Sequence, residues 1–265
     1  MVDAQAPGLA GVLRRIASIP ASGNGWPGRL LGEYAQLHLL ARAYDQVDAL
    51  PSGLAAVVRS RVGYTTARDD VLATQAVSDR WQVLGTRDVL DAAVPARRVW
   101  LRGRDTGRFA LLLSFAAGPG GRFPGTTEAV LTPGDEIRAD VHYYPGQPPL
   151  RAATGENRSA PGPGGQPVAG GIAALLDDWA AALEQDPWLT EWPALLSGTP
   201  VAPSTPSDSW YLADASGAAL PLLGRESLWL LLAVSGGNPV TVAGEWSADG
   251  LTPLTVWHDG RAVRL

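Results

Sequence analysis

The stretch that decides the fold lies at residues 97–115 and reads Arg-Arg-Val-Trp-Leu-Arg-Gly-Arg-Asp-Thr-Gly-Arg-Phe-Ala-Leu-Leu-Leu-Ser-Phe. Gly103 and Gly107 bracket a turn, because glycine accepts the positive φ angles that tight turns require. Alternating apolar residues on both sides of this turn predict two antiparallel strands. If Arg102 faces Arg108 across the turn, one face of the hairpin is apolar and belongs to a core, with Val99, Leu101, Phe109, Leu111, Leu113 and Phe115.

The opposite face of the predicted hairpin is basic and carries Arg98, Trp100, Arg102, Arg108 and Leu112. Like charges directly opposite each other cost stability, so Arg102 and Arg108 need Asp105, a carboxylate elsewhere in the fold or a bound anion. We favour an internal salt-bridged face, for which Glu245 is one candidate partner. The alternative is a surface for nucleic acid or an acidic partner, in which Trp100 stacks and arginines contact phosphate. Its candidate contact residues are Arg98, Trp100, Arg102, Arg104 and Arg108.

Composition sets further bounds on the kind of protein. The chain has 265 residues, of which 46% are hydrophobic, enough for a globular fold with one large or two small cores. The absence of cysteine excludes disulfides and thiolate metal sites. The net charge of −5 argues against nucleic-acid binding by the charge of the whole protein, although a local basic patch remains compatible with it.

The sequence contains no apolar run of membrane-spanning length, and Trp229–Val234, the longest candidate, has the length of a strand. The first residues, Met-Val-Asp-Ala-Gln-Ala-Pro, lack the basic region and apolar core of a signal peptide. We therefore expect a cytoplasmic protein without membrane contact.

The order of periodic segments predicts an α+β fold. An N-terminal helical bundle is followed by an antiparallel β-sheet or part-open barrel, a helical insert and a second antiparallel β region. In the second β region, Leu228–Ser235 is predicted as a strand, and Asp259-Gly260 marks a two-residue hairpin turn. The predicted boundaries are 1–78 for the helical region, 79–158 for the first β region, 159–167 for a linker, 168–198 for the helical segment and 199–265 for the second β region.

No motif for catalysis, cofactor or metal binding survives inspection. The histidines His38, His142 and His258 are far apart, and none has a second ligand at metal-binding spacing. A hydrolase would use Ser235 with His258, but a nucleophile elbow requires glycine two residues before the serine, where this chain has Ala233. We therefore predict no catalytic residue, no cofactor and no metal site, and an unrecognised hydrolase is the least favoured alternative.

Several ordered motifs nevertheless resemble one family. They include Trp26-Pro-Gly-Arg-Leu-Leu31, Asp79-Arg-Trp-Gln-Val-Leu-Gly85, Arg97-Arg-Val-Trp-Leu-Arg-Gly-Arg-Asp-Thr-Gly107 and Gly244-Glu-Trp246. Together they are similar to the region C-terminal to the finger in actinobacterial SWIM zinc-finger proteins. The finger itself, Cys-x-Cys followed by Cys-x-His, is absent, so no zinc ligand carries over.

The resemblance implies an accessory or adaptor role, because the family is often encoded beside a MoxR-type AAA+ ATPase and a von Willebrand A-type protein. We therefore expect a non-enzymatic protein-interaction region. Nucleic-acid contact through the Arg/Trp hairpin face remains the alternative.

Overall fold

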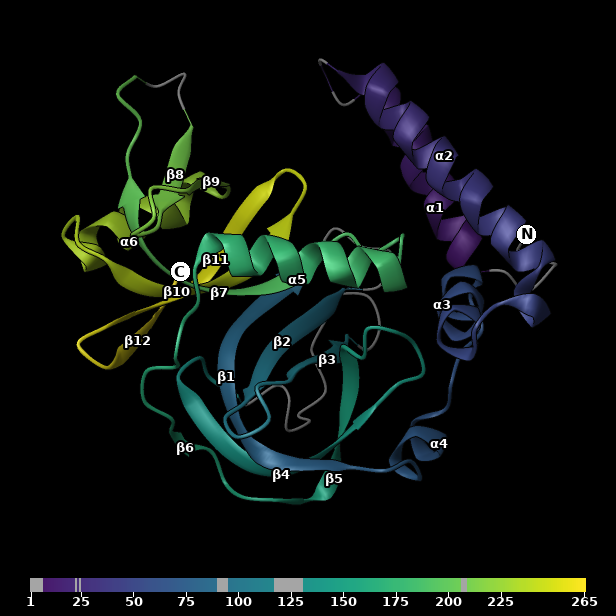
Figure 1. Cartoon of the computed structure of the whole chain (residues 1–265), viewed down its shortest axis with the longest axis horizontal. Helices are drawn as coiled ribbons and strands as arrows, with labels where there is room; N and C mark the ends of the chain where they lie inside the picture. Colours follow the sequence, from purple (N-terminus) through teal and green to yellow (C-terminus); the bar gives the residue numbers. More distant parts are fainter. Residues whose placement is uncertain (1–6, 22, 24, 90–94, 117–130, 206–208) are drawn as a thin grey trace.

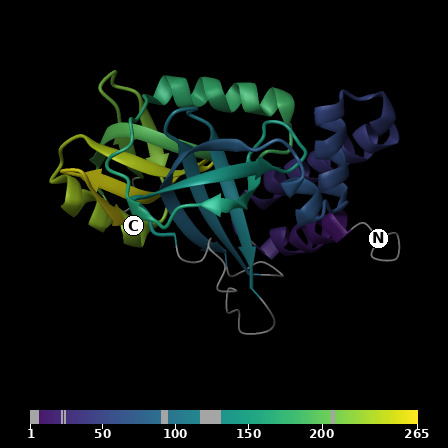
Figure 2. The same ribbon diagram turned by 90° about the horizontal axis from the view of Figure 1, so that it is seen from below.

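The computed structural model describes residues 7–21, 23, 25–89, 95–116, 131–205 and 209–265, and the predicted α+β class is confirmed. A helical region lies at one end of the molecule and a β unit formed by the C-terminal third lies at the other (Figure 1). A first β unit separates them, and the same arrangement is visible from below (Figure 2). Helix α5 (Ile172–Gln185) extends from the C-terminal β unit toward the helical region (Figure 1), and its buried residues Ile172, Leu175 and Ala182 belong to the core of the C-terminal β unit.

The helical region contains α1 (Pro7–Ser18), α2 (Trp26–Asp45), α3 (Ser52–Val62) and α4 (Arg68–Leu72), with short 3₁₀ turns between them. Helix α2 begins after Gly25, whose φ of 79° suits glycine, and Pro27 occupies its first turn. Leu40 on α2 and Val58 on α3 form a small core with Trp188, which follows α5 in the chain. The Trp188 indole donates to the Gln36 carbonyl oxygen at 3.0 Å, so this distant tryptophan anchors the helical region to the rest of the molecule.

The first β unit is a closed barrel of five strands, where the sequence predicted a sheet or part-open barrel. Its strands are β1 (Val77–Val89), β2 (Ala96–Gly103), β3 (Phe109–Phe115), β4 (Asp135–Tyr143) and β5 (Arg151–Arg158). The order β1-β2-β3-β5-β4 closes through a β1–β4 pairing, and β3 and β5 run parallel. This circuit is the Greek-key arrangement of OB-type barrels. Trp81, Leu101 and Ile137 fill its interior.

The register of the central hairpin differs by one residue from the predicted register. Arg102 pairs with Phe109 and Trp100 with Leu111, because the turn closes between Gly103 and Arg108 instead of between Arg102 and Arg108. A shift of one residue moves side chains to the other face of a strand. Val99, Leu101, Ala110 and Leu112 therefore fill the barrel, whereas Trp100, Phe109, Leu111 and Leu113 lie on its outer face.

The second β unit repeats the same circuit of strands. It contains β7 (Trp192–Val201), β8 (Trp210–Ala213), β9 (Ala219–Leu222), β10 (Val240–Ser247) and β11 (Gly250–His258). Their order is β7-β8-β9-β11-β10, with a β10–β7 pairing and a parallel β9–β11 bridge. Strand β12 (Arg261–Arg264) extends β11 through the Asp259-Gly260 turn, as the sequence predicted. Two units of equal topology therefore follow each other in the chain.

Three predicted segments differ in the structure. Residues 228–235 are not a strand but belong to helix α6 (Arg225–Ser235), which buries Leu228, Leu231 and Ser235 at helical spacing. Residues 192–198, predicted within a helical segment, begin strand β7. The predicted linker at 159–167 contains β6 (Gly162–Pro163), which pairs with β4 and so lies against the barrel.

Candidate functional site

The outer face of the central hairpin is the contact between the two barrels. Trp100 and Leu111 pack against Leu254 and Trp257 of β11 in a shared hydrophobic core. Gly85 on β1 permits this close approach, because a Cβ there would lie 2.8 Å from the Leu254 Cβ atom. The strand β2–β3 face, by which OB-type barrels bind ligands, is thus covered by the second barrel.

A buried carboxylate at this contact receives three donors from the first barrel. One Glu245 oxygen accepts hydrogen bonds from the Arg98 Nε and the Trp100 Nε1, each at 2.7 Å, and the other accepts from the Arg87 Nη1 at 2.5 Å. Only 1% of the Glu245 side chain is exposed. Burial alone would raise the pKa of Glu245, but attraction to Arg98, the Trp100 hydrogen bond and Arg87 hold it below its ordinary value.

A second carboxylate, Glu191, completes the group. Its Oε2 lies 2.6 Å from the Arg98 Nη2, and its Oε1 lies 3.6 Å from the Arg87 Nη1. Burial raises the pKa of Glu191, and the charge on Glu245 adds to that effect, while Arg98 opposes it. Two carboxylates therefore share two arginines at the junction of the barrels, which is an arrangement for joining them.

The other predicted contact residues also find partners within the chain, with one exception. The Arg102 Nη1 donates to the Val168 carbonyl oxygen at 2.6 Å, and its guanidinium lies 5.8 Å from the Phe109 ring centre. The Arg104 Nε donates to Glu136 at 2.7 Å. Arg108 is exposed and forms no salt bridge among the residues that the structure describes. The internal salt-bridged face is confirmed for Arg98, which pairs with Glu245, the carboxylate proposed from the sequence for an arginine of the hairpin, 147 residues away. Arg102, predicted to need an acceptor, finds a backbone carbonyl oxygen.

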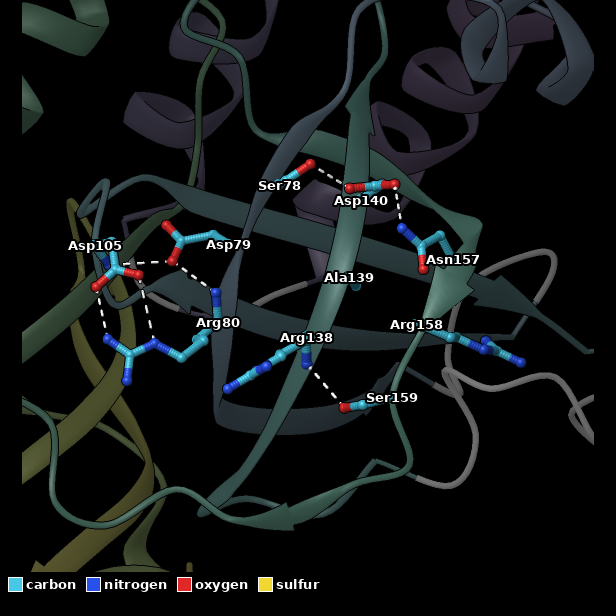
Figure 3. Close-up of a pocket in the computed structure, with 10 residues that line it drawn as sticks. All are labelled: Ser78, Asp79, Arg80, Asp105, Arg138, Ala139, Asp140, Asn157, Arg158 and Ser159. Carbon is cyan, nitrogen blue, oxygen red and sulfur yellow. Dashed lines mark hydrogen bonds and ion pairs between the residues drawn. The ribbon is translucent and has the colours of Figure 1, made fainter.

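A separate pocket of about 690 Å³ opens on the outer face of β1, β4 and β5 (Figure 3). Arg80, Arg138 and Arg158 line it, together with three aspartates. We call it the β1–β4 pocket. The sequence analysis missed this site because the pocket requires a β1–β4 pairing between segments some 60 residues apart. Alternation along β4 did place Arg138 on the polar side of that strand.

The aspartates of the β1–β4 pocket are all engaged. Asp79 accepts from the backbone N–H groups of Arg80, Asp105 and Thr106 at 2.6–3.1 Å and from the Thr106 hydroxyl at 2.6 Å, so it holds the hairpin turn. Burial by itself would raise the pKa of Asp79, but these hydrogen bonds more than offset burial and lower it. Asp105 pairs with Arg80 at 2.7 Å.

Asp140 accepts hydrogen bonds from the Ser78 hydroxyl and from the Asn157 amide, the second at 3.1 Å (Figure 3). These two bonds lower the pKa of Asp140. Donors from the chain itself thus favour the charged form of Asp79 and Asp140, and Asp105 is paired with Arg80.

The candidate hydrolase residues, Ser235 and His258, interact with different groups in the structure. Ser235 is buried at the end of α6, where its hydroxyl donates to the Leu232 carbonyl oxygen at 3.0 Å and accepts from the Gly237 N–H at 3.1 Å. His258 lies at the end of β11 beside Asp259, at 3.5 Å. Among the described residues, Ser235 and His258 share no hydrogen bond, and no three His, Asp or Glu side chains gather as a metal site would require.

Within the described part of the chain, no helix is long and apolar enough to cross a membrane.

Comparison with known families gives one match, over residues 1–62, to the SWIM-associated four-helix bundle domain. The matched segment contains α1, α2 and α3. No curated protein and no solved structure matches the chain. Residues 1–62 therefore relate this chain to SWIM-family proteins.

Proposed function

We propose that this chain is a non-enzymatic protein-interaction region of a SWIM zinc-finger-type protein. It acts in the cytoplasm as an adaptor for a MoxR-type AAA+ ATPase and a von Willebrand A-type protein. The observation that carries the proposal is the SWIM-associated domain at residues 1–62. The two partners are proposed because motifs along the whole chain resemble that family, which is often encoded beside such proteins.

The geometry supports a role without chemistry. The residue types that most often react or bind are used here for architecture: Glu245, Arg98 and Trp100 join the barrels, and the Ser235 hydroxyl bonds a carbonyl oxygen in the last turn of α6. Groups that satisfy each other inside a fold are not available to a substrate.

A protein partner is favoured over nucleic acid by the placement of the aromatic residue of the hairpin. Trp100 is 2% exposed and packs between the barrels, whereas base stacking requires an exposed aromatic face. The net charge of −5 also repels a polyphosphate backbone.

The test is capture of the ATPase and the von Willebrand A-type protein encoded beside the gene, each purified and passed over the immobilised chain. We expect saturable binding of at least one of them. Absence of binding by both proteins, together with binding of single-stranded DNA that weakens steeply with salt, would replace this proposal by the nucleic-acid alternative.

A pair of variants asks whether the SWIM-associated domain makes the contact. Leu31 and Tyr34 on α2 are 70% and 51% exposed, and Leu230 on α6, outside the matched segment, is 42% exposed. The substitutions Leu31→Glu and Tyr34→Glu together are expected to weaken capture about ten-fold, as loss of one or two interface residues does. Leu230→Glu is the matched control and is expected to leave capture unchanged.

A further inference from the structure

The β1–β4 pocket has an unbalanced row of charges at its centre. On the outer face of the sheet Arg80 pairs directly with Arg138, and Ser78 pairs directly with Asp140. Like charges directly opposite each other on adjacent strands are destabilising. Arg80 is relieved by its salt bridge to Asp105. Arg138 has no such relief, because Asp140 on the same strand is held by Ser78 and Asn157.

Arg138 and Arg158 are the unused charges of this pocket. Among the residues that the structure describes, no carboxylate lies within salt-bridge distance of either guanidinium. The backbone around them is satisfied, since the Arg138 N–H donates to the Ser159 Oγ at 3.0 Å and the Ser159 N–H donates to the Arg138 carbonyl oxygen at 2.8 Å. The guanidinium groups of Arg138 and Arg158 therefore remain available as hydrogen-bond donors, and such groups recognise oxyanions.

The two arginines extend in different directions from the strands that carry them. Figure 3 shows Arg138 directed toward Arg80 and Arg158 directed away from both. Two guanidinium groups that diverge do not close on a single small anion. They suit a ligand that carries separate negative groups along an extended chain.

The chemistry of the lining favours carboxylates on a polypeptide over a nucleic acid. None of the described residues that line the pocket is aromatic, so bases have nothing there on which to stack. The three aspartates of the lining would repel a continuous phosphate backbone. An acidic peptide carries its charges on flexible side chains, which can reach the arginines while the backbone stays clear of the aspartates.

We propose that the β1–β4 pocket binds an acidic segment of a partner protein, with Arg138 and Arg158 each pairing with one carboxylate of that segment. This inference rests on the proposed function as an interaction region and names the surface and the kind of partner sequence. The pocket volume of about 690 Å³ matches the 300–1,000 Å³ range of ligand sites.

The direct test is fluorescence anisotropy of a labelled oligoglutamate peptide with the full chain. We expect binding at low salt that weakens as salt is added, because exposed ion pairs are screened. Each exposed ion pair contributes only modestly, so Arg138→Gln and Arg158→Gln should each weaken binding by about three-fold and the double variant by about ten-fold. Arg261→Gln, an exposed arginine on β12, is the matched control and should bind like the wild type.

Two further probes separate the sources of negative charge. If oligothymidylate binds more tightly than oligoglutamate and loses its affinity in the double variant, the pocket is a nucleic-acid site and the proposal is overturned. If inorganic phosphate alone binds with the same dependence on both arginines, the pocket holds a small anion and the proposal is equally overturned. Equal losses in the control variant, or no binding of oligoglutamate, contradict it as well.

The capture experiment with the ATPase and von Willebrand A-type proteins distinguishes this inference from the proposed function. Capture that is lost in the Arg138/Arg158 double variant and kept in Arg261→Gln supports the pocket as the docking site. Capture that the double variant retains overturns the pocket and leaves the proposed function standing. Failure of the wild-type chain to capture either protein overturns the proposed function, and the peptide titration then decides the pocket by itself.

Discussion

The substitution Glu245→Gln tests the polar junction between the two barrels while keeping the size of the side chain. The Glu245 side chain is 1% exposed and accepts hydrogen bonds from Arg98, Trp100 and Arg87. Arg98 and Trp100 share one oxygen, so the amide oxygen of glutamine can keep both bonds. Its NH₂ group then faces the Arg87 Nη1, and two donors meet where a charge-assisted hydrogen bond existed.

The expected loss follows from that one contact. A hydrogen bond to a charged group contributes about 1.5–3 kcal/mol. Arg87 is 38% exposed on its side chain and lies 3.6 Å from Glu191, so water and Glu191 recover part of the loss. We expect the free energy of unfolding to fall by about 2 kcal/mol, which corresponds to a lower melting temperature by about 4–8 °C for a chain of this size.

The assay is urea unfolding followed by tryptophan fluorescence and by far-ultraviolet circular dichroism, at neutral and at acidic pH. Because the pKa of Glu245 is lowered in the folded protein, its stabilising effect is present above the ordinary glutamate pKa and is lost as the pH falls through the folded value. The difference between wild type and Glu245→Gln should therefore shrink in acid. Glu184→Gln, the same change on the exposed side of α5, should stay within about 0.5 kcal/mol of wild type.

Two results would refute the reasoning. A loss below about 0.5 kcal/mol at neutral pH would mean that Arg87 and Glu245 contribute no net stability, as is known for some buried pairs. A loss that is equal at both pH values would mean that the charge of Glu245 is not what the substitution removed. A double-mutant cycle with Arg87→Gln then shows whether the stability lost in Glu245→Gln comes from the contact with Arg87.

Three further changes address the turn, the helical anchor and the packing of the barrels. Asp79→Asn should lower the free energy of unfolding by about 1–2 kcal/mol at neutral pH. Because the pKa of Asp79 is lowered on folding, that difference should disappear as the pH falls below the ordinary aspartate range, which a urea titration series measures; a difference that persists in acid would contradict the role of its charge. Trp188→Ala should cost about 3–5 kcal/mol and expose the 1–62 segment to limited proteolysis, because Trp188 belongs to the helical core; unchanged cleavage would show that the anchor lies elsewhere. Gly85→Ala should destabilise by about 1–3 kcal/mol through overlap with Leu254, and Leu254→Ala should reduce that effect in the double variant when melting temperatures are compared; additive losses would mean that the two residues are not in contact.

Much of the local structure could be predicted because it depends on short-range patterns. The helices before Thr74, the central hairpin and the final turn at Asp259-Gly260 follow from apolar spacing and glycine placement. Helix α6 could not be recognised, because an apolar run such as Trp229–Val234 satisfies both a strand and a buried helix. Gly224 and Gly236, both left-handed in the structure, mark the ends of that helix.

The candidate sites divide in the same way. The sequence predicted that Arg102 and Arg108 need an acceptor and named Glu245 as a candidate partner for an arginine of the hairpin, and in the structure Glu245 pairs with Arg98. Burial of Trp100 was not predictable, because it required a second barrel to cover the outer face of the hairpin. The β1–β4 pocket was missed because its recognition depends on tertiary contacts. Asp79, Asp105 and Asp140 all interact with other groups in the folded chain, which leaves Arg138 and Arg158 without a carboxylate partner among the described residues.

The amino-acid sequence by itself determined the α+β class, the positions of most helices and turns, and the exclusion of disulfide and thiolate chemistry. These depend on residue types and on neighbours within a few positions. Three features were decided by the tertiary structure alone. They are the register of the hairpin, which differs by one residue from the predicted one, the closure of two barrels with the same strand order, and which charged side chains pair within the fold. The physical reason is that strand pairing and charge pairing join residues far apart in the chain, and their partners are chosen by packing, which local periodicity does not contain.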